Sequence, residues 1–132
     1  MDFIVKRSRW VCGRGYTASK GVPGYGAGIG DACLLNDDGF MCCLGHCALQ
    51  LGAKKKDILD VGMPDFVKFP LKVLTKKRNT VLFCTKLSNE AQKINDNSTI
   101  TNEEREERLK KLFKKHKHTI TFVGRYYSPK AK

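Results

Sequence analysis

The sequence lacks a long hydrophobic run. None of its apolar stretches approaches the roughly 18 residues that a membrane-spanning helix needs. Its first ten residues, MDFIVKRSRW, carry too many charges for a secretory signal peptide. These absences argue against a membrane protein and against a secreted one, so we expect a soluble, cytoplasmic protein that does not bind a membrane.

Several motifs of nucleotide-binding and nucleic-acid-binding proteins are also missing. The chain has no G-x-x-x-x-G-K-[ST] P-loop, and no G-x-G-x-x-G follows an expected strand. It has no helix-turn-helix, zinc-finger or RNP signature. P-loop enzymes, Rossmann enzymes and sequence-specific DNA readers are therefore disfavoured. No internal repeat is visible.

Acidic residues are absent from two parts of the chain. The protein has 25 Lys and Arg against 13 Asp and Glu, which gives a formal net charge of +12. Residues 67–86 hold six basic residues and no acid, and residues 108–132 hold nine basic residues and no acid. If these two segments meet in space, they make a strongly positive surface. A surface of this kind attracts nucleic acid, nucleotides, anionic membranes or an acidic protein, although net charge can also serve solubility alone.

The chain is organised around the stretch Leu34–Gly52, LLNDDGFMCCLGHCALQLG. Residues 36–39, Asn-Asp-Asp-Gly, are typical of a tight turn. From Phe40 onwards apolar residues recur at helical spacing, and Gly52 is suited to end a helix. This pattern predicts a short strand over Ala32–Leu35, then the turn, then a buried helix.

The clearest single element is a helix that follows Thr101. Thr101 and Glu104 form a capping box, in which each side chain satisfies an orphan backbone N–H. Glutamates precede lysines along this helix, as its dipole favours, and Glu106 is spaced to pair with Lys110. The expected buried stripe consists of Leu109, Leu112 and Phe113.

Other segments supply the rest of the fold. We expect strands in Asp2–Val5 and Thr119–Val123, a hairpin that pairs 67–75 with 80–85, and short helices after Lys54 and from Leu87. Because strands and helices do not alternate regularly, the pattern is typical of an α+β protein. We expect a single domain over residues 1–132 with a small, mostly antiparallel sheet and about three to four helices.

The segment Gly13–Gly30, GRGYTASKGVPGYGAGIG, has seven glycines in eighteen residues, so we expect a long loop. Long loops in compact domains are often functional, and backbone N–H groups beside cations can hold a phosphate. The residues expected to bind phosphate are Arg7, Arg9, Arg14, Thr17, Ser19 and Lys20, and those expected to stack on a base are Trp10, Tyr16 and Tyr25. A place in the core is the alternative for Trp10.

Six cysteines would suggest disulfides in a secreted domain, whereas in a reducing cytosol we expect free thiols. Cys42, Cys43, His46 and Cys47 contain two i, i+4 pairs, but these pairs point to different faces of the expected helix. A zinc site would need a further ligand from elsewhere, and nothing in the sequence places a base beside a cysteine nucleophile. Packing is thus favoured over metal binding and catalysis, and no cofactor is expected.

The segments GFMCCLGHCALQLG, AQKIND, EEREERLKKLF and TFV resemble small accessory proteins carried by bacteriophages. The resemblance covers roughly Leu34–Val123. It implies a protein that acts in the cytoplasm of the host cell as an inhibitor or a sequestering agent, rather than as an enzyme. No catalytic residues are carried over with it.

Charge, loop and resemblance together lead to one functional hypothesis. We expect a non-enzymatic, phage-type binding protein that captures a small anionic nucleotide, most concretely a nucleotide immune signal. The alternatives are a sequence-tolerant nucleic-acid-binding protein and a direct inhibitor of an acidic host protein, and a homo-oligomer is left open. The nucleic-acid surface would consist of Lys76, Lys77, Arg78, Lys110, Lys114 and Arg125, with Arg125 in a basic tail over 124–132.

Overall fold

The computed structural model describes residues 2–12, 34–36, 39–60, 85–97 and 99–126. The glycine-rich loop and nearly all of the expected hairpin lie outside these residues. The described elements, in chain order, are β1 (Asp2–Lys6), the 3-10 turn η1 (Arg7–Arg9), α2 (Cys43–Gln50), α3 (Lys55–Ile58), α5 (Thr85–Asp96), α6 (Asn102–Lys115) and β2 (Thr119–Val123).

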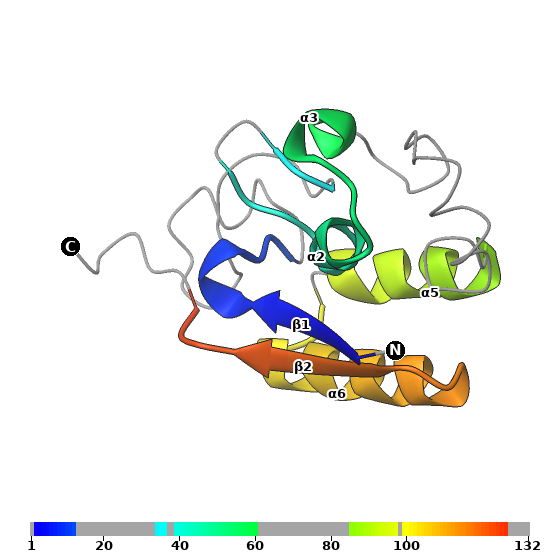
Figure 1. The fold of residues 1–132 in the computed structure, drawn as a ribbon. Helices are drawn as coiled ribbons and strands as arrows, with labels where there is room; N and C mark the ends of the chain where they lie inside the picture. The colour runs from blue at the N-terminus through cyan, green and yellow to red at the C-terminus, as the bar shows by residue number, and fades with distance from the viewer. Residues whose placement is uncertain (1, 13–33, 37–38, 61–84, 98, 127–132) are drawn as a thin grey trace.

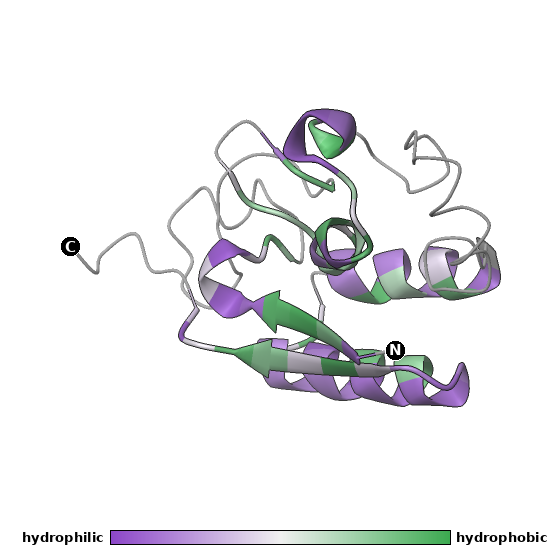
Figure 2. Cartoon of the chain, in the orientation of Figure 1, coloured by the Kyte–Doolittle hydropathy of each residue, from purple (hydrophilic) through white to green (hydrophobic). Residues whose placement is uncertain are grey.

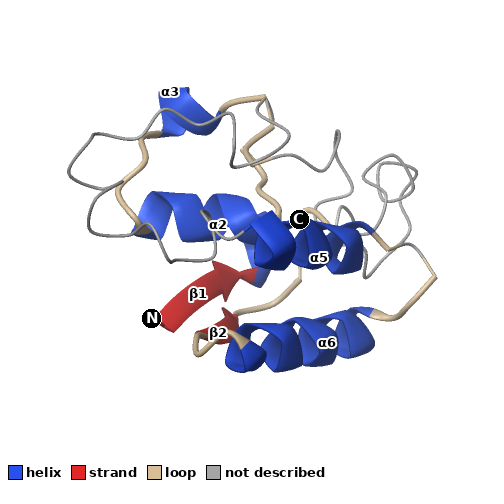
Figure 3. Ribbon diagram, turned by 90° about the vertical axis from the view of Figure 1, so that its right-hand side faces the viewer, coloured by secondary structure: helices blue, strands red, loops and turns tan. Residues whose placement is uncertain are grey.

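The sheet lies between two layers of helices (Figure 1). α6 packs against β2, α2 packs against β1, and α5 contacts both α2 and α6. α3 lies beyond α2 on the side away from the sheet, as Figure 3 also shows. The strands are largely hydrophobic and α6 is largely hydrophilic along its length (Figure 2). This small arrangement of helices and strands confirms the expected α+β class.

The two strands run parallel, so the expectation of a mostly antiparallel sheet is wrong for the described residues. Phe3 pairs with Ile120 and Val5 pairs with Phe122 in the register of the sheet. Parallel neighbours need a crossover connection, and here the chain passes through all the described α-helices before it returns. These four residues are buried, and they alternate with exposed residues along both strands.

The edge of β1 opposite β2 is paired with a side chain. The amide of Gln50, at the end of α2, accepts a 2.8 Å hydrogen bond from the N–H of Ile4. The same amide donates a 2.6 Å hydrogen bond to the carbonyl of Ile4. Gln50 therefore makes at this one residue the two bonds that a neighbouring strand would make.

α2 begins later than the apolar spacing predicted. The helix starts at Cys43, because Met41 is paired with the segment that follows η1. The N–H of Met41 donates to the carbonyl of Arg9 at 2.8 Å, and its own carbonyl accepts from the N–H of Val11 at 2.9 Å. This backbone pairing holds residue 41 in an isolated β-bridge. The apolar residues at helical spacing therefore begin at Phe40, before the first residue of the helix itself.

The turn before α2 and the end of α2 are as predicted. Oδ1 of Asn36 accepts a 3.0 Å hydrogen bond from the N–H of Phe40, and Gly39 adopts the φ of +85° that glycine favours. Gly52 follows the helix with a φ of +105°. Gly45 within α2 has a different role: a Cβ there would lie 1.8 Å from the carbonyl oxygen of Leu34. Only a glycine lets the helix approach that backbone.

α6 confirms the predicted helix and its N-cap at Thr101, but not the second half of the capping box, because the Glu104 carboxylate accepts from Arg108 at 2.9 Å instead. The Thr101 hydroxyl accepts a 3.1 Å hydrogen bond from the N–H of Glu104, and the stripe of Leu109, Leu112 and Phe113 is buried. The stripe also includes Arg105, which is fully buried. Its guanidinium donates to the carbonyls of Asn97 and Ile100 and to the side chain of Asn102. None of the helices in the described part of the chain is long and apolar enough to cross a membrane.

Candidate anion-binding site

Three of the residues expected to bind a nucleotide are described: Arg7, Arg9 and Trp10. The others lie outside the described residues, namely Arg14, Tyr16, Thr17, Ser19, Lys20 and Tyr25, as do Lys76, Lys77 and Arg78 of the alternative surface. The three described residues follow one another closely in sequence, yet the structure gives them three different environments.

Arg7 is bound within the protein. Its Nε and Nη2 donate to the two carboxylate oxygens of Glu106 at 2.8 and 2.7 Å, and its Nη1 donates to the carbonyl of Gly124 at 3.0 Å. The expected pair between Glu106 and Lys110 is replaced by this bidentate pair, because the planar guanidinium fits a carboxylate better than an ammonium does. The pair links η1 to α6. The Arg7 guanidinium is therefore engaged within the protein and is not available to bind a phosphate.

Tyr126 completes this cluster. Its ring lies 5.4 Å from the Arg7 guanidinium, and its hydroxyl donates to the Glu106 carboxylate. Burial raises the pKa of Glu106, but the hydrogen bonds from Arg7 and Tyr126 outweigh burial and lower the pKa on balance. Glu106 is therefore ionised at neutral pH, as the ion pair requires.

Trp10 is a core residue. It is fully buried, its indole N–H donates to Oδ1 of Asn95 at 2.7 Å, and its ring packs against those of Phe122 and Tyr126. An external base has no free face of this ring to stack on. Of the two roles considered for Trp10, the structure places it in the core.

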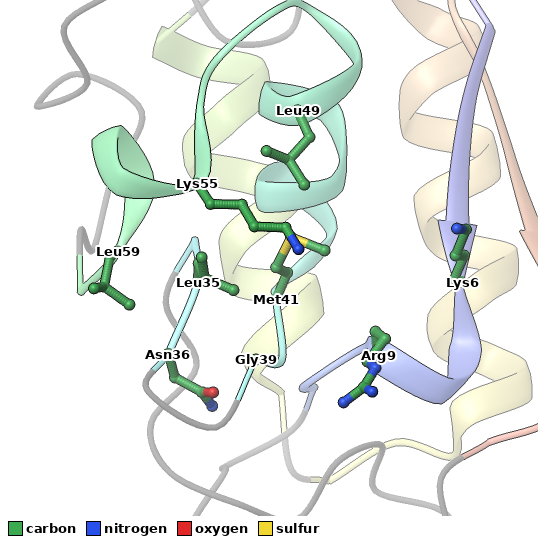
Figure 4. A pocket seen from close by; sticks show the side chains of 9 residues that line it. All are labelled: Lys6, Arg9, Leu35, Asn36, Gly39, Met41, Leu49, Lys55 and Leu59. Carbon is green, nitrogen blue, oxygen red and sulfur yellow. The ribbon is translucent and has the colours of Figure 1, made fainter.

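Arg9 is exposed and lines an open pocket of about 650 Å³ (Figure 4). Its guanidinium lies 5.4 Å from the centre of the Phe40 ring, a cation–π contact that orients the side chain. Lys6 at the end of β1 and Lys55 at the start of α3 line the same pocket. Figure 4 shows Lys6 and Arg9 on one side and Leu35, Leu59 and Asn36 on the other, with Lys55 reaching between them.

The remaining lining of this pocket is mainly apolar. No carboxylate of a described residue lines the pocket, and neither Arg9, Lys6 nor Lys55 forms an ion pair with a described residue. The apolar lining consists of Leu35, Met41, Leu49 and Leu59, beside Gly39 and the amide of Asn36. Cations around an apolar surface are suited to a ligand that carries both an anionic group and a ring or chain.

A second pocket, of about 320 Å³, adjoins the first. The two share Lys6, Met41 and Leu49, and the second is completed by Ile4, His46 and Gln50. It is bounded by β1 on one side and α2 on the other. The two adjoining pockets are together called the hollow, and Arg9 and Lys55 line only the first of them.

His46 is a buried, neutral member of the second pocket. It is only 4% exposed, and burial lowers the pKa of its imidazole to about 4, against a hydrogen bond with the Arg9 backbone that raises it. Its Nε2 has no hydrogen-bond partner among the described residues. This nitrogen is itself buried from solvent.

The described cysteines are buried free thiols, as expected for packing residues. Burial raises the pKa of Cys12 to about 12 and raises the pKa of Cys43 and of Cys47 as well, so these thiols stay protonated and are poor nucleophiles. Within the described ranges, no group of three or more His, Cys, Asp or Glu side chains is placed to hold a metal ion, the set Cys42, Cys43, His46 and Cys47 included.

The alternative surface is represented by Lys110 and Lys114 on α6 and by Arg125. All three side chains are exposed. Lys111 and Lys115 are exposed on the same helix. The four lysines of α6 form a basic strip, and α6 lies on the opposite side of the sheet from α3 (Figure 1).

Sequence reasoning missed Lys6 and Lys55 as pocket residues. Lys55 lies in the run Lys54-Lys55-Lys56, which predicted only the start of a short helix. The signal that could have found it is the cluster of charge at a helix start, where no helix dipole favours cations.

Comparison of the chain with protein-family models, with curated proteins and with solved structures finds no match.

Proposed function

We propose that this protein is a non-catalytic binding protein that captures a small anionic ligand of the nucleotide class in the pocket between Lys6, Arg9 and Lys55. One observation carries the proposal: three cations from three separate elements surround a mainly apolar surface without a described carboxylate among them. A phosphate would neutralise the cations, and the apolar lining would cover a sugar or a base.

Binding without catalysis is supported by the chemistry of the buried groups. The described thiols with shifted pKa values are held protonated, and the imidazole that lines the hollow is neutral and buried. The resemblance to phage accessory proteins suggests a biological setting for such capture. In that setting the ligand is a nucleotide immune signal of the host, and its sequestration protects the phage.

Isothermal titration at fixed salt tests the proposal, with mono-, di- and cyclic nucleotides and inorganic pyrophosphate as ligands. We expect stoichiometric binding of at least one of them, weakened about tenfold or more in Arg9→Ala and Lys55→Ala, because each variant loses a charge-assisted hydrogen bond. Lys111→Ala is the matched control, since it removes the same charge from an exposed site on α6. Equal weakening in the control variant, or no binding of any ligand, contradicts the proposal.

A second candidate function rests on the basic strip of α6. The exposed Lys110, Lys111, Lys114 and Lys115 suit the phosphates of a single- or double-stranded nucleic acid. This function predicts binding that strengthens with oligonucleotide length and weakens steeply with salt. It also predicts that Lys111→Ala, and not Lys55→Ala, is the damaging variant, so one set of proteins separates the two functions.

A further inference from the structure

We infer that the pocket between Lys6, Arg9 and Lys55 selects a nucleotide with two phosphate groups over a nucleotide with one. This inference rests on the proposed function and names the class of nucleotide that the same site prefers, a nucleoside diphosphate or bisphosphate. In this arrangement Arg9 binds one phosphate group, and Lys6 and Lys55 bind the other.

The Arg9 guanidinium is the first observation. It lies 5.4 Å from the centre of the buried Phe40 ring, so the side chain is oriented before any ligand binds. None of its N–H groups donates a hydrogen bond to a described residue, whereas those of Arg7 are used by Glu106 and by the carbonyl of Gly124. A guanidinium presents parallel N–H groups that fit two oxygens of a single phosphate. Arg9 is therefore suited to bind one phosphate group by itself.

The position of the two lysines is the second observation. The Arg9 guanidinium points toward Gly39 (Figure 4), and a Cβ on that glycine would lie 3.8 Å from the Nη1 of Arg9. Lys55 instead extends from α3 toward Met41 (Figure 4). Lys6 and Met41 line both pockets, so they lie where the two pockets adjoin. Positive charge is thus present at two places in the first pocket, and the lysines remain available after Arg9 has bound one phosphate.

The charge balance of the first pocket is the third observation. Three cations line it, no carboxylate of a described residue does, and none of the three forms an ion pair with a described residue. Like charges in one pocket repel each other, so a bound ligand is stabilised more strongly when it carries more negative charge. The volume of about 650 Å³ is within the range of sites that hold ligands larger than a single ring, which leaves room for a second phosphate group.

The experiment compares three nucleotides by isothermal titration at fixed salt: adenosine 5′-monophosphate, adenosine 5′-diphosphate and adenosine 3′,5′-bisphosphate. Magnesium is left out, because it would bind the phosphates in place of the lysines. We expect at least one of the two-phosphate nucleotides to bind about tenfold or more tightly than the monophosphate, the effect of one added charge-assisted hydrogen bond. Which of them binds more tightly shows whether the two phosphates are adjacent or separated by the ribose.

Two negative results have different meanings. If neither two-phosphate nucleotide binds more tightly than the monophosphate, the inference is overturned and the proposed function stands. If none of the three nucleotides binds, and pyrophosphate does not bind either, the proposed function fails and the inference fails with it.

Variants at exposed positions separate this selection from the attraction of a net charge of +12. Lys6→Ala and Lys55→Ala should each lower the preference for two phosphates and leave the affinity for adenosine 5′-monophosphate nearly unchanged. Arg9→Ala should weaken both kinds of nucleotide by the same factor and keep the preference, and the control Lys111→Ala should change neither. If both lysine variants keep the full preference, or if all four variants lower it equally, the second phosphate is not bound by Lys6 and Lys55 and the inference is wrong.

Discussion

The indole N–H of Trp10 donates a 2.7 Å hydrogen bond to Oδ1 of Asn95, which lies 85 positions further along the chain. The same oxygen accepts a 3.0 Å bond from the backbone N–H of Cys43, the first residue of α2. The Nδ2 of Asn95 donates to the carbonyl of Val11 and to Oδ1 of Asp96, both at 3.0 Å. Asn95 thus uses both donors and both lone pairs, and joins the segment after η1, the start of α2 and the end of α5.

Asn95→Ala should destabilise the protein by about 3 kcal/mol or more, because it leaves buried donors on Trp10 and Cys43 and a carbonyl on Val11 without a partner. The free energy of unfolding in urea measures the loss. Asn89→Ala is the control, since residue 89 is exposed on the same helix. A loss in Asn95→Ala no larger than that of the control would show that the network does not hold these elements together.

Gly45→Ala should destabilise the protein by about 3 kcal/mol, although alanine is the better helix former by about 1 kcal/mol. The reason is the carbonyl of Leu34, which lies where the new methyl group must go. Gly124→Ala separates crowding from backbone strain: its φ is +81°, but a Cβ there meets nothing within 4 Å. We expect a loss of about 1 kcal/mol there. Thermal and urea unfolding of both variants test this order, and the reverse order would refute close packing at residue 45.

Asp96→Asn should stabilise the protein at pH 7 and change little at pH 4. Burial raises the pKa of Asp96 to about 6, against the hydrogen bond from Asn95 and the charge of Arg105, which lower it. The folded state therefore holds this proton more tightly than the unfolded state, so stability falls as the pH rises from about 4 to 6. The asparagine avoids this loss and keeps an oxygen to accept from Asn95, which should yield about 2–3 kcal/mol at pH 7.

Urea unfolding at both pH values measures the effect of Asp96→Asn. Glu107→Gln removes an acid from an exposed position and is the control for net charge. A gain that is the same at pH 4 and pH 7, or one shared by the control, would show that titration of Asp96 is not its source.

The parts of the fold that depend on neighbouring residues were predictable from the sequence. The N-cap at Thr101, the turn at Gly39 and the helix end at Gly52 each follow from one or two side chains and their local backbone. The direction of strand pairing was not predictable in this way. It depends on which element lies beside β1, and its partner β2 begins at Thr119, far along the chain.

The candidate site was predicted only in part for the same reason. Arg9 was predicted to bind phosphate, and the structure places it exposed at a pocket. Arg7 was given the same role from the same sequence surroundings, but it is paired with Glu106, 99 residues away. Lys55 was assigned to a short helix, and nothing local links it to Arg9. His46 attracted attention as a metal ligand, whereas its burial and its free Nε2 become visible only when α2 is placed beside β1.

The parallel pairing of β1 with β2 has a consequence for protein synthesis. β1 is translated before every other described element, and β2 is translated after all of them. Until the ribosome has passed Val123, Phe3 and Val5 therefore lack their partner strand β2. A nascent chain that stops before Thr119 would contain every described helix and still lack the sheet of β1 and β2.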